Sequence, residues 1–363
     1  MQHCKRCLMP DTRPGSIFKD GICQACYNYE SRSAVNWDKR LKELRELCDK
    51  YRKSDGSYDC VIPVSGGKDS HFLAHIMVEE MHMHPLLVTV TDSFTHSQAG
   101  SHNLRNMIET FKLNHYLYTI NHDLFKRATR IAFETTGEAL KFVEYAIYTI
   151  PTLVAQKFDI SLVVFGENSS FEYGTTSKNF FDASPIVKTM SDTLEKDRQW
   201  WIEHGLSSAE VGSIQLDKNK PLPLVIYMSY FIPWSSVRNL EVAKRYGFRT
   251  LAHEWEREGC VENFEQMDSF AYLVHLWLKY PKFGFQRTSD IVSRRLREGR
   301  LTIEEAKQLI KEKDHKLDQK AMIDFISFLG YTQKEFWEIT DKLWNREIFE
   351  QKEGEWILKN PPY

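Results

Sequence analysis

Residues 60–70 read Cys60-Val61-Ile62-Pro63-Val64-Ser65-Gly66-Gly67-Lys68-Asp69-Ser70. The apolar run predicts a buried strand over 58–64, and the residues that follow the loop predict a helix over 70–81. Two adjacent glycines permit positive φ and let backbone N–H groups approach a ligand. The start of a helix adds unpaired donors and a partial positive charge. The segment therefore predicts an anion-binding loop where a buried strand passes into a helix.

The side chains of this loop suit a nucleoside triphosphate. Lys68 supplies a full charge, the hydroxyls of Ser65 and Ser70 can donate to phosphate oxygens, and Asp69 suits Mg²⁺. The spacing is not that of a Walker A motif, which places four residues between its first glycine and the Gly-Lys pair. The ordinary alternative is a glycine-rich turn without a ligand.

The loop resembles the signature Ser-Gly-Gly-x-Asp-Ser of the PP-loop ATP pyrophosphatases. The resemblance implies that ATP is cleaved between its α and β phosphates, with Lys68 and Asp69 in catalytic roles. It also implies that ATP and Mg²⁺ are held by Ser65, Gly66, Gly67, Lys68, Asp69 and Ser70.

Further strands and helices alternate after the loop. We expect strands at 85–90, 115–120 and 161–165 and helices at 103–111 and 145–158. Apolar strands separated by helices predict a doubly wound parallel α/β sheet, which binds ligands at the carboxyl ends of its strands. The expected division is a zinc-ribbon-like segment at 1–30, a linking helix at 31–57, a HUP-like PP-loop domain at 58–184 and a mainly helical substrate or partner region at 185–363.

Polar residues follow two of the later strands. Thr91 and Asp92 end the second strand, where this fold commonly receives the adenine. Gly166, Glu167 and Asn168 follow the strand at 161–165, where a phosphate or metal contact is expected. We expect Gly166 to contact the nucleotide and Glu167 to act in acid–base catalysis, although a polar turn is the simpler interpretation.

Four cysteines form two close pairs, Cys4-x2-Cys7 and Cys23-x2-Cys26, within the first 30 residues. Four thiolates with this spacing suit a closed, tetrahedral zinc site. Binding Zn²⁺ would supply the folding free energy that so short a segment cannot obtain by burial. The alternatives are an iron–sulfur cluster and a redox pair.

Segments outside the loop resemble the N-acetyl sugar amidotransferases. They are Thr91–Phe94 with Gly100, Asn103 and Leu104; Gly166–Asn168 with Glu172–Gly174; Tyr230–Trp234; Glu241–Phe248; Leu278–Phe285 with Arg287 and Asp290; and Arg297–Arg300. The amino-terminal cysteines belong to the same pattern. One departure is Thr175, where the family pattern leads us to expect a second glycine.

This resemblance implies conversion of a sugar acetamido group to an acetamidino group, in lipopolysaccharide synthesis or in flagellin sugars of the pseudaminic and legionaminic acid type. Adenylation of the amide oxygen would let ammonia displace AMP. Substrate contacts are expected from Asn168, Glu172, Tyr173, Lys279, Lys282 and Arg287. The last three could contact pyrophosphate or an anionic group of the sugar, and the alternative is that they are cations on a helix surface. The chain lacks a nucleophilic cysteine directly after Met1 and a Gly-x-Cys-x-Gly elbow, so we expect a separate glutaminase and an ammonia-conducting partner.

Composition restricts the alternatives. The net charge of -2 gives no basic surplus for a nucleic-acid partner, and the basic stretch at 294–300 is interpreted as a solvated helix face. No apolar run is long enough to cross a membrane, and no signal peptide precedes the cysteines, so we expect a cytoplasmic protein. Two other hypotheses are a tRNA-modifying PP-loop enzyme, forming thiolated bases or lysidine, and a catalytically silent nucleotide-binding scaffold.

Overall fold

The structure is a computed structural model that describes residues 1–175 and 180–363. A five-stranded parallel sheet lies at its centre, with the strand order β5-β4-β3-β6-β7. The strands are β3 (Cys60–Pro63), β4 (Pro85–Thr91), β5 (His115–Thr119), β6 (Leu162–Phe165) and β7 (Leu224–Tyr227). The doubly wound α/β class expected from the sequence is confirmed.

The fifth strand, β7, comes from the segment assigned above to the helical region. It pairs with β6 in parallel over four residues. Pro221 and Pro223 precede it, and prolines weaken the prediction of a strand because they cannot donate to a ladder. The sheet therefore extends beyond residue 184.

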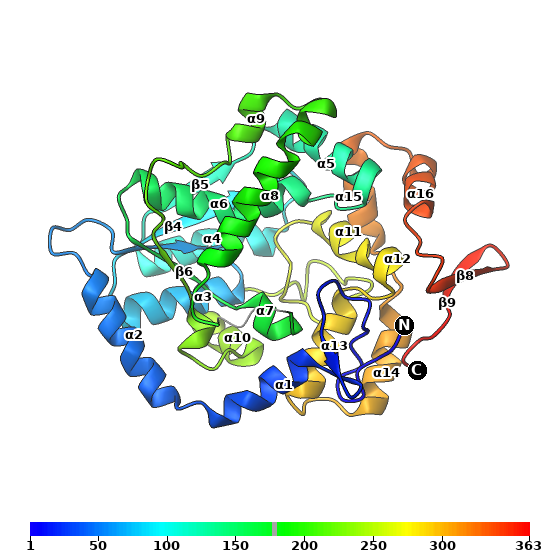
Figure 1. Ribbon diagram of the computed structural model, residues 1–363, viewed down its shortest axis with the longest axis horizontal. Coiled ribbons are helices and arrows are strands. Elements are labelled where there is room, and N and C mark those ends of the chain that lie inside the picture. The colour runs from blue at the N-terminus through cyan, green and yellow to red at the C-terminus, as the bar shows by residue number, and fades with distance from the viewer. Residues whose placement is uncertain (176–179) are drawn as a thin grey trace.

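Helices cover both faces of the sheet (Figure 1). Side chains of β3 alternate between two cores: Val61 packs with α6 (Lys141–Lys157), while Cys60 and Ile62 pack with α3 (Lys68–His75). On the second face α3 lies against α10 (Ser236–Arg245). The carboxyl ends of β3 and β6 are thus the point where the strand order reverses, which is where ligands bind in such sheets.

The amino-terminal segment lies beside a short helix that follows β6. Its elements are β1 (Phe18–Lys19), β2 (Ile22–Cys23), α1 (Gln24–Ser31), η1 (Arg32–Ala34) and α2 (Trp37–Tyr51). The Asn28 amide of α1 donates to the carbonyl oxygen of Phe171 in α7 (Ser169–Tyr173) over 2.9 Å. Figure 1 shows this segment, in dark blue, against α7 and α13.

The remaining elements surround the sheet and form the helical carboxyl-terminal region. Around the sheet lie η2 (Ile76–Glu80), α4 (Gln98–Phe111), α5 (His122–Thr136), α8 (Ser184–Glu203), α9 (Ser208–Gly212) and η3 (Met228–Tyr230). The carboxyl-terminal elements are α11 (Tyr272–Trp277), α12 (Lys279–Phe283), α13 (Arg287–Arg297), α14 (Ile303–Lys313), α15 (Gln319–Leu329), α16 (Gln333–Asp341), β8 (Phe349–Lys352) and β9 (Glu355–Leu358). Thr302 and Thr332 begin α14 and α16 with complete capping boxes. Within the described ranges, no helix combines the length and apolar character needed to cross a bilayer.

Candidate active site

A cavity of about 750 Å³ opens at the carboxyl ends of β3, β4 and β6, a volume within the range of small-ligand sites. Its walls come from the loop after β3, the end of β4 with α4, strand β5, the face of α6, the end of β6 with Glu167, and the segment 264–294. The predicted residues that line it are Ser65, Gly67, Lys68, Asp69, Ser70, Thr91, Asp92, Glu167 and Arg287.

The phosphate loop is held tightly against α4. Gly66 has φ +85°, and a methyl group added to it would lie 2.6 Å from the backbone nitrogen and Cα of Leu104. The backbone N–H of Ser65 donates to the Ser70 hydroxyl over 3.0 Å, and that of Gly67 donates to the Ser65 hydroxyl over 3.3 Å. The loop is therefore ordered by its own hydroxyls, and helix α3 begins within it at Lys68.

Lys68 is a residue of the loop and the first residue of α3. Its side chain is 5% exposed, and its ammonium pairs with Asp69 over 2.6 Å and with Glu265 over 3.0 Å. Burial lowers the pKa of Lys68, but Asp69 and Glu265 raise it more, so the group stays charged. Asp69 also accepts from the amide of Asn239 over 2.7 Å, and its more exposed carboxylate is suited to Mg²⁺.

Glu265 is the hub of an ion-pair network at this end of the cavity. Its side chain is 3% exposed and pairs with Lys68, with Arg294 over 2.6 Å and with Arg287. The Ser236 hydroxyl donates to the same carboxylate over 2.9 Å. Burial raises the pKa of Glu265, but the three cations hold it well below its ordinary value. Glu265 therefore remains ionised.

A second group of polar residues lines the cavity at the end of β4. The Asp92 carboxylate accepts from the Ser269 hydroxyl over 2.7 Å and lies 3.5 Å from His96. Burial and the charge of Asp92 raise the pKa of Asp268 to about 7. Thr91 lines the same wall. This end of the cavity is acidic, whereas the end near Lys68 is basic.

The residues after β6 place one more carboxyl group in the cavity. Gly166 leaves room for the indole of Trp234, which a methyl group would approach to 3.1 Å. Asn168 is buried and caps α7 by accepting from the Phe171 N–H over 3.1 Å. Glu167, between Gly166 and Asn168 in the sequence, lines the cavity. Burial, and then the charges of Asp69 and Glu172, raise the pKa of Glu167 to about 7.

The residues expected to contact substrate lie in different places. Glu172 pairs with Arg32, and the Tyr173 hydroxyl accepts from Arg287 over 2.8 Å. Lys279 pairs with Asp290 over 3.0 Å, and Lys282 donates to the Gly137 carbonyl over 3.0 Å. Of the six residues expected to contact substrate, only Arg287 lines the cavity as the described residues define it. Substrate roles for the other five, Asn168 included, remain predictions.

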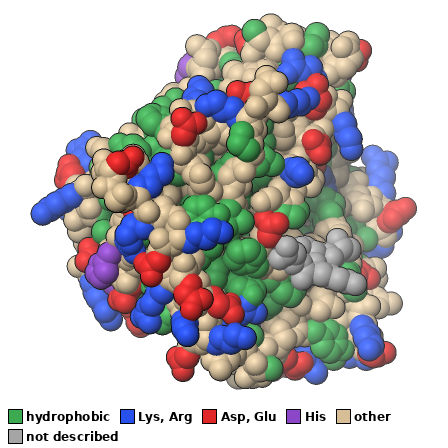
Figure 2. All heavy atoms as spheres, turned by 60° about the vertical axis from the view of Figure 1, so that its left-hand side comes forward, with side chains coloured by type: hydrophobic (Ala, Val, Ile, Leu, Met, Phe, Trp, Pro, Cys, Tyr) green, Lys and Arg blue, Asp and Glu red, His purple; other side chains and the backbone are tan. Residues whose placement is uncertain are grey.

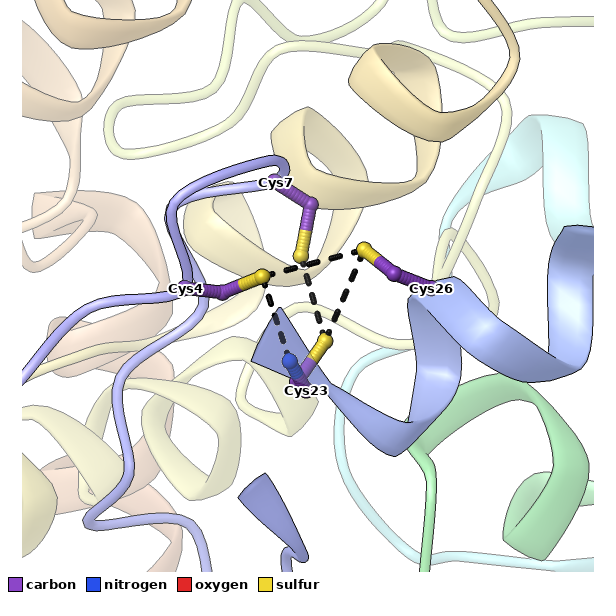
Figure 3. A group of neighbouring side chains, drawn as sticks. All are labelled: Cys4, Cys7, Cys23 and Cys26. Carbon is purple, nitrogen blue, oxygen red and sulfur yellow. Dashed lines mark hydrogen bonds between the residues drawn. The ribbon is translucent and has the colours of Figure 1, made fainter. Parts of the chain in front are cut away.

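The four amino-terminal cysteines form a compact group. All four are buried and free of disulfides, and their sulfur atoms lie within 4.8 Å of one another. The shortest contacts are 3.4 and 3.7 Å, close to the separation of about 3.8 Å between thiolates around tetrahedral Zn²⁺. Figure 3 shows the four sulfurs directed toward one point. The group therefore fits a metal ion.

The sequence interpretation missed the acidic and basic residues that close the cavity. Glu265, Asp268 and Arg294 line it but belong to no local motif. The interpretation of 294–300 as a solvated helix face is wrong for its first half. Arg294 and Arg295 pair with buried Glu262 and Glu265, and Arg297 donates to Cys7 over 3.7 Å. The carboxylates that neutralise these arginines lie about thirty residues earlier in the chain, so sequence spacing did not indicate the pairing.

The strand order, with a Ser-Gly-Gly-Lys-Asp-Ser loop at the point of reversal, agrees with the fold and the loop signature of the PP-loop class. Residues 258–360 match the family described as LPS biosynthesis protein WbpG-like, C-terminal domain. This match confirms the predicted resemblance over the carboxyl-terminal region. The region that matches contributes Glu265, Arg287 and Arg294 to the cavity.

Comparisons with individual proteins are more distant. The chain is 24% identical over 161 residues to the uncharacterized protein MJ1599 of Methanocaldococcus jannaschii, which is 44% of this chain and 57% of the relative's length. NMN synthetase from Francisella tularensis matches with 11% identity and a TM-score of 0.34, over 83% of this chain and 96% of that chain. The U34-tRNA thiolase NcsA from Methanococcus maripaludis matches with 12% identity and a TM-score of 0.34, over 86% of this chain and 90% of that chain. These likenesses are loose, so the class rests on the strand order and the loop.

Proposed function

We propose that the protein is an ATP-dependent amidotransferase that converts the acetamido group of a sugar into an acetamidino group, releasing AMP and pyrophosphate. The observation that carries the proposal is the loop at residues 65–70, which opens into a cavity walled by a WbpG-like domain. The sugar substrate is inferred from the family resemblance, and the use of ATP is inferred from the loop.

The proposed reaction has two displacements. The amide oxygen attacks the α phosphorus of ATP, a new P–O bond forms, and the bond to the β phosphate breaks, so pyrophosphate leaves. Ammonia then attacks the amide carbon, the C–O bond breaks, and the oxygen departs on AMP. The nitrogen loses its extra proton to a base, and the product is an amidine.

Residues of the chain have separate tasks in this scheme. The loop amides and Lys68 bind the phosphates, and their positive charge stabilises the negative charge that builds on pyrophosphate. Asp69 would hold Mg²⁺, which supplies further positive charge to the phosphates. Glu167, with a pKa of about 7, is suited to take the proton from the attacking nitrogen.

The test is to follow the acetamido oxygen. The enzyme is incubated with ATP, Mg²⁺, ammonium salt and acetamido sugars whose amide oxygen carries a heavy isotope. We expect the label in AMP, and a sugar whose mass falls by the difference between oxygen and NH. Label in neither product, with bulk tRNA stimulating pyrophosphate release instead, would refute the proposal.

A second prediction concerns the nitrogen donor. We expect the purified chain to form product with ammonium salts and to form none with glutamine until a glutaminase is added. The physical reason is that glutamine hydrolysis needs a nucleophilic cysteine, and Cys48 and Cys60 are buried while no elbow motif surrounds Cys260. The measurement is product formation with each donor. Glutamine use by the chain alone would contradict this prediction.

A third prediction concerns pH. A base must be ionised to accept a proton, so kcat/KM is expected to rise with pH through about 7, the pKa of Glu167. Glu167→Gln is expected to lower the rate by about 10²- to 10⁴-fold and to remove this rise. Asp268→Asn is the comparison, because the pKa of Asp268 is also about 7. If the rise persists in the first variant and disappears in the second, the base is Asp268.

The surface agrees with a small-molecule substrate. On the face drawn in Figure 2, Lys and Arg side chains are interspersed with Asp and Glu, and hydrophobic side chains gather near its middle. The chain as a whole carries a net charge of -2. A mixed surface of this kind does not favour binding to a polyanionic backbone.

A further inference from the structure

We propose that Arg294 is a further catalytic residue, which binds the pyrophosphate part of ATP opposite the phosphate loop, and that Glu265 and Arg287 are positioning residues that hold it there. The inference rests on the use of ATP in the proposed function and is independent of the sugar. It distinguishes two arginines of one helix by the hydrogen bonds that each already makes.

Each guanidinium nitrogen of Arg287 already makes a hydrogen bond to a neighbouring side chain. Its Nε donates to Gln266 over 3.0 Å, its Nη1 donates to the Tyr173 hydroxyl over 2.8 Å, and its Nη2 donates to Glu265. All three guanidinium nitrogens are therefore engaged, whereas only one nitrogen of Arg294 is. Arg287 supplies charge and rigidity to the wall of the cavity.

Arg294 is different. Its Nη2 donates to Glu265 over 2.6 Å and lies 3.5 Å from Glu262. Within residues 1–175 and 180–363, its Nε and Nη1 make no hydrogen bond, and neither is buried away from solvent. The side chain lines the cavity that contains the phosphate loop. Arg294 thus has one side of its guanidinium anchored and the other side available.

The helix explains why both arginines reach the same wall. Residues 287 and 294 are seven positions apart in α13, so they lie on one face after two turns. Arg295, the next residue, points elsewhere and donates to Glu262 over 2.8 and 3.0 Å. It does not line the cavity as the described residues define it.

Charge determines which part of the nucleotide Arg294 meets. Lys68, Arg287 and Arg294 all pair with Glu265. Lys68 also pairs with Asp69, and Arg294 shares Glu262 with Arg295. These four cations exceed the three carboxylates by one charge, which favours an anionic ligand at this end. Asp92 and Asp268 line the other end, where no cation of the Glu265 network lies and any ionised carboxylate repels phosphate. A planar guanidinium can donate two parallel hydrogen bonds to phosphate oxygens. Pyrophosphate therefore fits between the loop and Arg294, with the nucleoside toward β4.

The experiment measures binding of inorganic pyrophosphate and of AMP, each with Mg²⁺, to the full chain by calorimetry. We expect Arg294→Met to weaken pyrophosphate binding by about 10- to 100-fold, with AMP binding near that of the wild type. Arg295→Met is the matched control: it removes the same charge from the next position and should leave both affinities near those of the wild type. Arg294→Lys, which keeps the charge and loses the planar fork, should give a smaller loss.

Several outcomes would overturn the assignment. Arg294→Met could bind pyrophosphate as the wild type does, or Arg295→Met could lose as much. A parallel loss of AMP binding would indicate a general structural effect. A third arm, binding of a nucleotide-linked acetamido sugar without ATP, covers the other anionic ligand: a loss confined to that sugar would place Arg294 on the acceptor substrate. If Arg294→Met does not fold, as judged by thermal melting, Arg294→Lys decides by the same criteria.

Discussion

Replacing Gly66 with alanine is expected to abolish ATP-dependent pyrophosphate release. Alanine at φ +85° costs about 1–2 kcal/mol. The added methyl group would also lie 2.6 Å from the backbone of Leu104, and backbone atoms cannot move aside as the end of a long side chain can. The loop and α4 must separate, which removes the loop amides from their places around the phosphates. Pyrophosphate release and ATP binding are the measurements.

Gly56 provides a control for the backbone cost alone. It has φ +82°, nearly that of Gly66, but no atom lies within 4 Å of the position a methyl group would take. Gly56→Ala should therefore lower the thermal stability slightly and leave pyrophosphate release near that of the wild type. Full activity in Gly66→Ala would show that the loop does not hold the nucleotide.

Replacing Cys23 with serine is expected to remove the metal from the amino-terminal segment and to destabilise the fold of that segment. We propose Zn²⁺ as the ion, at about one per chain. Structural zinc contributes about 10–16 kcal/mol in small zinc-binding peptides, far more than the packing of a segment with two-residue strands can provide. The measurements are metal content, limited proteolysis of residues 1–30 and thermal melting. A visible absorption band from the metal-bound protein would indicate an iron–sulfur cluster.

The effect should reach the active site through α7. The segment braces this helix by the bond from Asn28 to Phe171 and by the ion pair between Arg32 and Glu172, and Glu167 precedes the same helix. We therefore expect Cys23→Ser to lower activity as well as stability. Cys260→Ser is the control, because Cys260 lies outside the cysteine group. A Cys23→Ser protein that keeps its metal and its resistance to protease would refute the proposed site.

Prediction from sequence succeeded where the information is local. The phosphate loop and each cysteine pair are contiguous patterns, and the strand before the loop is a continuous apolar run, so their positions follow from the chain itself. The two-residue strands β1 and β2 beside the cysteines were not predicted. Glu265 and Arg294 could not be predicted in the same way. Each forms its ion pair with a partner more than twenty residues away in the sequence. A charged residue on a helix is ordinarily solvated. Burial of these ion pairs became visible only in three dimensions.

The wall formed by Glu265, Arg287 and Arg294 has a consequence for folding during synthesis on the ribosome. The loop and strands β3 to β6 of the central sheet emerge before α13, and an amino-terminal portion of a chain can begin to fold before the rest is made. Such a nascent chain holds the phosphate loop without Arg287 and Arg294, because they are translated more than 200 residues after the loop. It should therefore bind the pyrophosphate part of ATP more weakly until α13 has emerged and docked.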